Sequence, residues 1–188
     1  MNEQNVKTSR TRILAEIIVM AALSAVLYAL PRFSLPFGGS VTLGSMVPVM
    51  WLSLRRGVYT GVLAGAIFGI LGFFIDILYL GAANIIATPL QAVLEYPVAS
   101  AMLGLTGIFR RKTVAPALAG VAISVFIKFL IHYFVGVFVW SQVYEFPPEW
   151  GLWLWPAVYN GSFLTAEAII SGILLVILIK RHTLEYAL

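Results

Sequence analysis

Long apolar runs separated by short polar segments dominate the chain, and these runs predict its helices. None of them shows the period-2 alternation over about ten residues that marks a membrane barrel strand. Six helices are expected, over Ile13–Leu30, Ser40–Leu54, Val58–Leu80, Pro89–Phe109, Val114–Trp140 and Pro156–Ile179. The second run is short for a hydrocarbon layer of roughly 30 Å, so we expect it to be thinly embedded or shielded by its neighbours. The pattern therefore predicts an all-α bundle of six transmembrane helices.

Composition supports this class. Of the 188 residues, 61% are hydrophobic and 11% are charged, whereas a soluble domain is about half apolar and about a quarter charged. We therefore expect one transmembrane domain over residues 1–188 in a lipid bilayer, with a short basic tail over about residues 1–12. The chain has no cysteine, which excludes disulfides and thiolate metal sites. We expect no metal and no cofactor.

The basic residues indicate how the chain is oriented, because lysine and arginine favour cytoplasmic loops. With the N-terminus inside, ten of the twelve basic residues fall on the cytoplasmic side: Lys7, Arg10, Arg12, Arg55, Arg56, Arg110, Arg111, Lys112, Lys180 and Arg181. The pattern predicts that both termini are cytoplasmic. Because the positive residues cluster at the ends of apolar runs, the net charge of +4 does not indicate nucleic-acid binding.

The outer loops have a different character, with prolines, glycines and acidic residues, among which we place Asp76. A cluster of tryptophans, Trp150, Trp153 and Trp155, precedes the sixth run. It is either an interfacial aromatic belt or the wall of a pocket that opens outward. The chain contains no G-x-x-x-x-G-K-[ST] motif, so it has no recognisable loop for hydrolysing ATP. It also shows no nucleophile–base set, and we do not expect an enzyme.

Ionisable residues inside the apolar runs are the main functional signal, because such groups are costly in a membrane and face a cavity or a partner. Lys128 and His132 lie four residues apart in the fifth run, and Glu95 is the obvious acid in the fourth. A Glu95–Lys128 ion pair either only ties two helices together or presents a ligand carboxylate that Lys128 holds in place. Glu167 is mid-run and receives no assignment. Glu16, near the basic end of the first run, is expected to pair or to snorkel there.

Three further residues each have two interpretations. His132 is either a neutral imidazole bonded to a neighbouring helix or a ligand contact. Trp140 is either a belt anchor or a flat face that stacks on a ligand cation. Asn160 either bonds to another helix or recognises a heterocycle through its donors and acceptor. One acid, one imidazole, one amide and several aromatic rings together suit a small aromatic solute with a positive charge.

These residues resemble the thiamine-specific S components of energy-coupling factor (ECF) vitamin transporters. The resemblance covers most of the chain and rests on combined motifs: Ser53-Leu54-Arg55-Arg56-Gly57, Leu94-Glu95-Tyr96-Pro97-Val98-Ala99, Lys128-Phe129 with His132, Phe138-Val139-Trp140-Ser141-Gln142, and Tyr159-Asn160-Gly161. It implies a six-helix bundle that binds thiamine in an outward-facing pocket of a prokaryotic cell membrane. It also implies partners: a transmembrane coupling subunit and two cytoplasmic ATPase subunits.

The resemblance further implies roles for individual residues. Thiamine would be held by Glu95, Tyr96, His132, Trp140, Asn160 and Trp155, with Trp140 stacked on the thiazolium ring and Lys128 holding Glu95. The coupling subunit would dock on a stripe of small residues in the first run, Ala21, Ala22 and Ala25. The chain departs from the family at Gly38-Gly39-Ser40, where a pocket aromatic is often found, and over Phe73 to Ala87, where Tyr79 is a candidate for another.

Two other functions stay open at this point. The chain could be an S component for another vitamin or for a thiamine precursor, which ligand competition would reveal. It could also be a proton-coupled secondary transporter that uses Glu95 and His132, although proton relays usually need several carboxylates or unwound helix pairs.

Overall fold

The computed structural model describes residues 10–36, 39–109 and 113–181. Lys7, Arg110, Arg111 and Lys112, which contribute to the expected orientation, lie outside these residues, as does Gly38.

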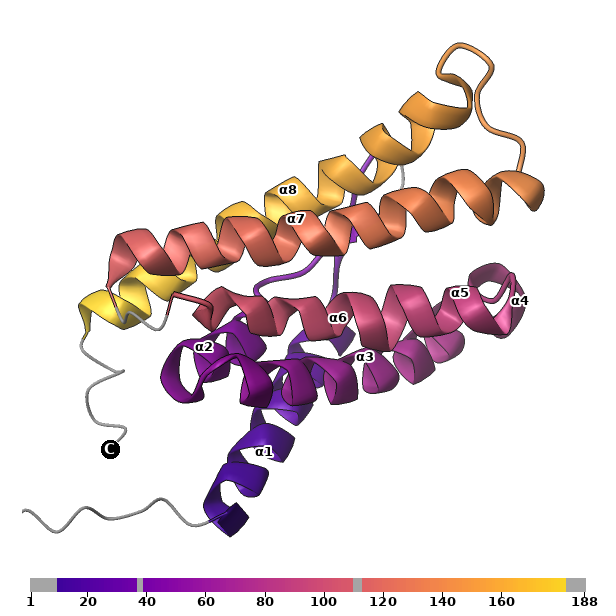
Figure 1. Ribbon diagram of the computed structural model, residues 1–188. Helices are drawn as coiled ribbons and strands as arrows, with labels where there is room; N and C mark the ends of the chain where they lie inside the picture. The colour runs from indigo at the N-terminus through magenta and orange to yellow at the C-terminus, as the bar shows by residue number, and fades with distance from the viewer. Residues whose placement is uncertain (1–9, 37–38, 110–112, 182–188) are drawn as a thin grey trace, which may run out of the picture.

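The helices pack in layers (Figure 1). In one layer, α7 (Val114–Phe138) and α8 (Gly151–Lys180) lie side by side and run antiparallel. In the next layer, α3 (Val58–Leu80) packs against the helical segment that follows α4 (Ala82–Ile85). The first helix, α1 (Arg10–Ala29), crosses α3 on the side away from α7.

Four helices are long and apolar enough to cross a membrane: α1, α3, α7 with its extension to Gln142, and α8. This confirms the predicted class of helical membrane protein. The predicted bounds of the third run agree with α3, and α7 begins at Val114 as expected. The sixth helix begins earlier than predicted, at Gly151, and Pro156 therefore lies inside it, where its missing N–H removes one backbone hydrogen bond.

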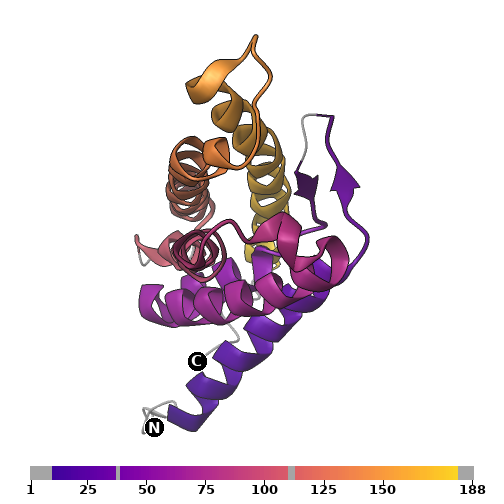
Figure 2. The ribbon, with the colours of Figure 1, turned by 90° about the vertical axis from the view of Figure 1, so that its right-hand side faces the viewer.

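The second run is only partly helical, so its predicted start at Ser40 was wrong. Ser40–Val41 forms strand β2, which pairs antiparallel with β1 (Phe33–Ser34) in a small hairpin beside the bundle (Figure 2). Gly44 then adopts a φ of +92°, which a helix does not allow. Helix α2 covers only Val47–Arg56, and its Val49, Met50 and Leu52 have no exposed surface. The expectation that neighbours shield this run is therefore confirmed.

The fourth run is helical but irregular. It consists of α5 (Pro89–Val93), the π-helical turn η1 (Leu94–Val98), α6 (Ala99–Ala101) and the 3₁₀ segment η2 (Met102–Gly107). The side chain of Thr88 caps its start by accepting a hydrogen bond from Gln91 N at 3.0 Å. Pro97 lies in η1, where its missing N–H and its ring disturb regular α-helical bonding.

Glycines let this irregular segment approach α3 closely. A Cβ on Gly104 would overlap the backbone of Gly61 and Val62, and one on Gly69 would overlap the carbonyl group of Tyr96. The two backbones are therefore in contact at both positions, as small residues permit between membrane helices. This contact fixes the height and rotation of η1, which carries Glu95 and Tyr96.

The ends of the helices separate into two groups (Figure 1). The α2–α3 junction, the start of α7 and the end of α8 lie at one end of the bundle, and α4 and the loop before α8 lie at the other. Arg55, Arg56 and Lys180, at helix termini, therefore share one end, as the charge pattern predicts.

Candidate functional site

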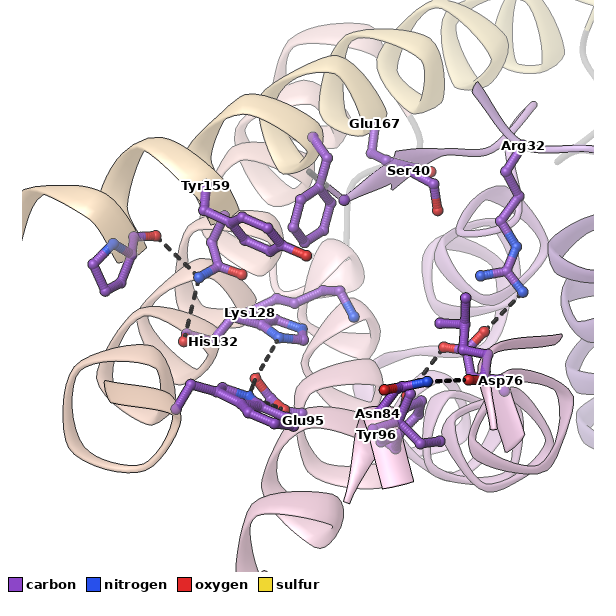
Figure 3. A pocket seen from close by; sticks show the side chains of 18 of the residues that line it. Arg32, Ser40, Asp76, Asn84, Glu95, Tyr96, Lys128, His132, Tyr159 and Glu167 are labelled. Carbon is purple, nitrogen blue, oxygen red and sulfur yellow. Dashed lines mark hydrogen bonds and ion pairs between the residues drawn. The ribbon is translucent and has the colours of Figure 1, made fainter. Parts of the chain in front are cut away.

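A cavity of about 580 Å³ opens between α3, η1, α7 and α8 (Figure 3). The seven residues that the sequence assigned to a ligand site all line it: Glu95, Tyr96, Lys128, His132, Trp140, Trp155 and Asn160. They come from three separate parts of the chain. The structure thus brings the expected constellation together in one place.

Glu95 is the most heavily bonded residue of the cavity. Trp140 Nε1 donates to its Oε1 at 3.1 Å and to its Oε2 at 3.0 Å. His132 Nδ1 lies 3.5 Å from Oε1, and Gln91 Nε2 donates to Oε2. Gln91 has no exposed surface and also bonds to the carbonyl of Ile85 at 3.2 Å, so it is itself fixed in place. Three side chains therefore hold this carboxylate.

His132 and Asn160 meet across the interface of α7 and α8. Asn160 Nδ2 donates to the carbonyl oxygen of Pro156 at 3.0 Å and to that of His132 at 3.5 Å. Its amide oxygen is the group left for a ligand. The Nε2 atom of His132 is buried, and it has no hydrogen-bond partner among the described residues. The structure shows the helix–helix hydrogen bonds of Asn160, and the ligand contacts of both residues stay predictions.

Aromatic side chains form much of the outer wall. Trp140 stacks on Tyr144 with ring centroids 5.6 Å apart and an interplanar angle of 23°. The ring centroid of Trp155 lies 6.2 Å from that of Trp150 and 6.2 Å from that of Tyr159. Tyr144 and Tyr159 also line the cavity, whereas Trp153 is exposed. Of the tryptophan cluster, Trp155 is thus a wall residue, and Trp153 fits the aromatic belt.

The expected ion pair between Lys128 and Glu95 does not form. Lys128 is buried and lines the cavity, but within the part of the chain that the structure describes its ammonium has no carboxylate within 4 Å. The sequence interpretation failed here because it treated Glu95 as the one buried acid of the bundle.

A second buried acid is Asp76, which the sequence interpretation wrongly placed in an outer loop. It lies inside α3 with an exposed fraction of 5%. Arg32 forms an ion pair with it at 2.8 Å, and the hydroxyls of Tyr28 and Tyr96 donate to it at 2.7 and 3.0 Å. Arg32 also lies over the ring of Tyr28, 4.0 Å from its centroid. An aspartate within an apolar run was the signal for this cluster.

Tyr96 therefore presents its ring to the cavity, because its hydroxyl is bonded to Asp76. Tyr79, the other candidate aromatic, is 64% exposed and bonds to the carbonyl of Ala29 at 2.8 Å. It does not line the cavity.

A third buried acid is Glu167, which received no assignment from the sequence. Its Oε1 atom accepts hydrogen bonds from Thr42 N at 2.5 Å and from Thr42 Oγ1 at 2.7 Å. Its Oε2 atom is buried and has no hydrogen-bond partner among the described residues. Glu167 thereby attaches the segment after β2 to α8, and it lines the inner part of the same cavity.

The proposed docking stripe is divided by the packing of α1. Ala21 and Ala25 are buried inside the bundle, with exposed fractions of 0% and 7%, while Ala22 is exposed. Of the three, only Ala22 can meet a partner in this structure. Earlier in α1, Glu16 forms an ion pair with Arg56 at 2.7 Å, which is one of the two outcomes expected from the sequence.

Comparisons with known proteins agree with this architecture. Residues 14–186 match the thiamine transporter protein family. The chain is 30% identical over 178 residues to the thiamine transporter ThiT of Bacillus subtilis, with 88% of each chain covered. It is 27% identical over 179 residues to ThiT of Lacticaseibacillus paracasei, covering 89% of this chain and 84% of that protein.

Solved structures show the same fold. ThiT from Listeria monocytogenes has a TM-score of 0.75 at 27% identity, covering 92% of this chain and 95% of that one. The S component of a bacterial ECF transporter has a TM-score of 0.62 at 17% identity, covering 93% and 97%. The family match spans nearly the whole described chain, and this protein belongs to the family of thiamine transporter proteins.

Proposed function

We propose that this protein is a membrane-embedded S component that captures thiamine at the outer face of a prokaryotic cell membrane for uptake by an ECF-type transporter. It is a multi-pass membrane transport protein and not an enzyme. The proposal joins the family membership to the chemistry of the cavity.

The charge of the cavity is the observation that carries the choice of ligand. Its buried or partly buried walls contain three carboxylates, Asp76, Glu95 and Glu167, and two cations, Arg32 and Lys128. With all three carboxylates ionised and His132 neutral, this set of side chains carries one uncompensated negative charge. An uncompensated charge is costly in a low-dielectric interior. The thiazolium ring of thiamine carries one positive charge, which would balance it, whereas a neutral vitamin would not.

The positions of the side chains also suit thiamine. Glu95 and the aromatic faces of Trp140 and Tyr96 would hold the thiazolium by charge and by cation–π attraction. The Asn160 amide oxygen would accept a hydrogen bond from the amino group of the pyrimidine, and His132 Nε2 would provide another polar contact. Trp155 would close the wall on the outer side. In this assignment Lys128 lines the site without pairing with Glu95.

Uptake requires energy that this chain has no motif to supply. The proposed partners are a transmembrane coupling subunit and two cytoplasmic ATPase subunits, with the exposed Ala22 of α1 as part of the docking face. We further propose that α5 through η2 crosses the membrane as one irregular helix, that α2 is the shielded second helix of a six-helix bundle, and that both termini are cytoplasmic.

Titration of the detergent-purified protein with thiamine, followed by tryptophan fluorescence, tests the ligand. We expect saturable quenching by thiamine and none by riboflavin or biotin. Glu95→Gln should weaken binding at least about tenfold, because it removes the charge nearest the cation. A folded wild-type protein that does not respond to thiamine would contradict the proposal and favour another vitamin-like ligand.

Co-expression with the subunits of an ECF module tests the partners. The chain should co-purify with the module, and thiamine uptake into liposomes should require ATP. Uptake driven by a pH gradient without the module would instead identify a secondary transporter.

A further inference from the structure

Two groups of opposite charge in the cavity wall have no bonded partner. Lys128 is a buried residue, and within the described part of the chain its ammonium has no carboxylate within 4 Å, while the buried Oε2 atom of Glu167 has no donor there. Glu95, in contrast, has both of its oxygens occupied by Trp140, His132 and Gln91. The free donors and the free acceptor therefore belong to Lys128 and Glu167.

The fold places these two residues on neighbouring helices. Lys128 is on α7 and Glu167 is on α8, the two helices that lie side by side, and both line the cavity (Figure 3). Glu167 is held in place through its Oε1 atom by Thr42, so its other oxygen keeps a fixed position. Its exposed fraction is only 3%, and that of Lys128 is 8%.

We infer that Glu167 is the counter-ion of Lys128 and thereby leaves the charge of Glu95 uncompensated for a cationic ligand. Glu167 is thus a positioning residue that acts through Lys128. This inference rests on the proposed function for its ligand. Asp76 is paired with Arg32, so without Glu167 the buried carboxylate left for Lys128 would be Glu95, and the two would neutralise each other at the expense of the ligand cation.

The inference assigns to each variant a net charge, summed over the three carboxylates and two cations of the cavity wall. The wild type has a net charge of −1, Glu167→Gln has 0, Lys128→Met has −2, and the double variant returns to −1. Preference for a cation over an uncharged ring should follow this charge. The matched probes are thiamine and a neutral analogue in which the thiazolium is replaced by an uncharged five-membered ring.

Calorimetric titration with both probes tests the inference. We expect Glu167→Gln to weaken thiamine binding by about tenfold and to change binding of the neutral analogue by less than about threefold. Adding Lys128→Met to Glu167→Gln should restore the preference for thiamine to within about threefold of the wild type. An unchanged preference in Glu167→Gln, or no rescue by Lys128→Met, would overturn it.

Melting temperatures measured without ligand test the charge compensation between Glu167 and Lys128 by itself. Glu167→Gln leaves the buried Lys128 side chain without a compensating charge and should lower the melting temperature by about 10 °C, and the double variant should recover most of that loss. Additive losses in the double variant would overturn the pairing. If the wild type failed to bind thiamine, the proposed function would fail. The melting temperatures of these variants would still decide whether Glu167 compensates the charge of Lys128.

Two control variants separate charge from structure. Thr42→Val removes one hydrogen bond to Glu167 but no charge, and Glu16→Gln removes a carboxylate outside the cavity. Both should keep the wild-type preference for thiamine over the neutral analogue. A loss of preference in Thr42→Val equal to that in Glu167→Gln would show that the tether, and not the charge, is responsible.

Discussion

The indole N–H of Trp140 donates to both carboxylate oxygens of Glu95, at 3.1 and 3.0 Å, across 45 residues of sequence. This contact joins the end of α7 to η1 at the outer part of the cavity. Trp140 therefore orients the carboxylate as well as providing an aromatic face. The two contributions can be separated by substitution.

Trp140→Phe keeps an aromatic ring but removes the N–H donor. We expect thiamine binding to weaken by about tenfold, because a hydrogen bond to a charged group is lost. Isothermal titration calorimetry is the suitable measurement, since it does not depend on tryptophan fluorescence. In a Glu95→Gln background the same substitution should have less effect. Equal effects in the two backgrounds would show that Trp140 acts only by stacking.

Asp76→Asn should destabilise the protein by about 3 kcal/mol, because Arg32 would stay partly buried without its charged partner. Thermal unfolding in detergent measures this. The double variant Arg32→Gln, Asp76→Asn removes both charges and should be more stable than Asp76→Asn alone. A double variant that is less stable than either single variant would contradict the ion pair.

Gly104→Ala should destabilise the protein by about 3 kcal/mol or prevent its folding, because a Cβ at this position overlaps the backbone of α3. Gly161→Ala is the matched control, since the nearest atom to its added Cβ is Phe129 Cε2 at 3.7 Å, an ordinary contact. The two purified variants can be compared by their melting temperatures. Equal stability would show that α3 and η2 separate more easily than the packing indicates.

The absence of cysteine makes the topology directly measurable. Glu149→Cys, in the exposed loop before α8, should react with a membrane-impermeant maleimide on intact cells. Arg181→Cys, at the exposed end of α8, should react only after the cells are permeabilised. The unsubstituted chain is the control for background labelling. The opposite pattern would reverse the proposed orientation.

The helices and the cavity were largely predictable from sequence because hydrophobic length and intramembrane polar residues are strong signals. The run Val58–Leu80 agrees with α3 in both bounds. Glu95, His132 and Asn160 converge on one cavity although they are distant in the chain.

Partner choice among buried charges was not predictable, because it depends on distances between helices that a sequence does not contain. Lys128 was assigned to Glu95, but among the described residues it forms no ion pair, and Glu95 is bonded to Trp140. The hairpin of β1 and β2 was missed because Ser40 to Leu54 reads as one apolar run, and the break at Gly44 is conformational.

The short helix α2 has a consequence for the surroundings of a solute in the cavity. The chain from Gly39 to Met46 descends into the bundle without regular helical bonding, and part of it lines the cavity. Non-helical backbone at membrane depth is tolerated where it is buried in protein or lines a water-filled space. A solute held in the cavity therefore lies beside the peptide groups of this segment and not beside lipid chains.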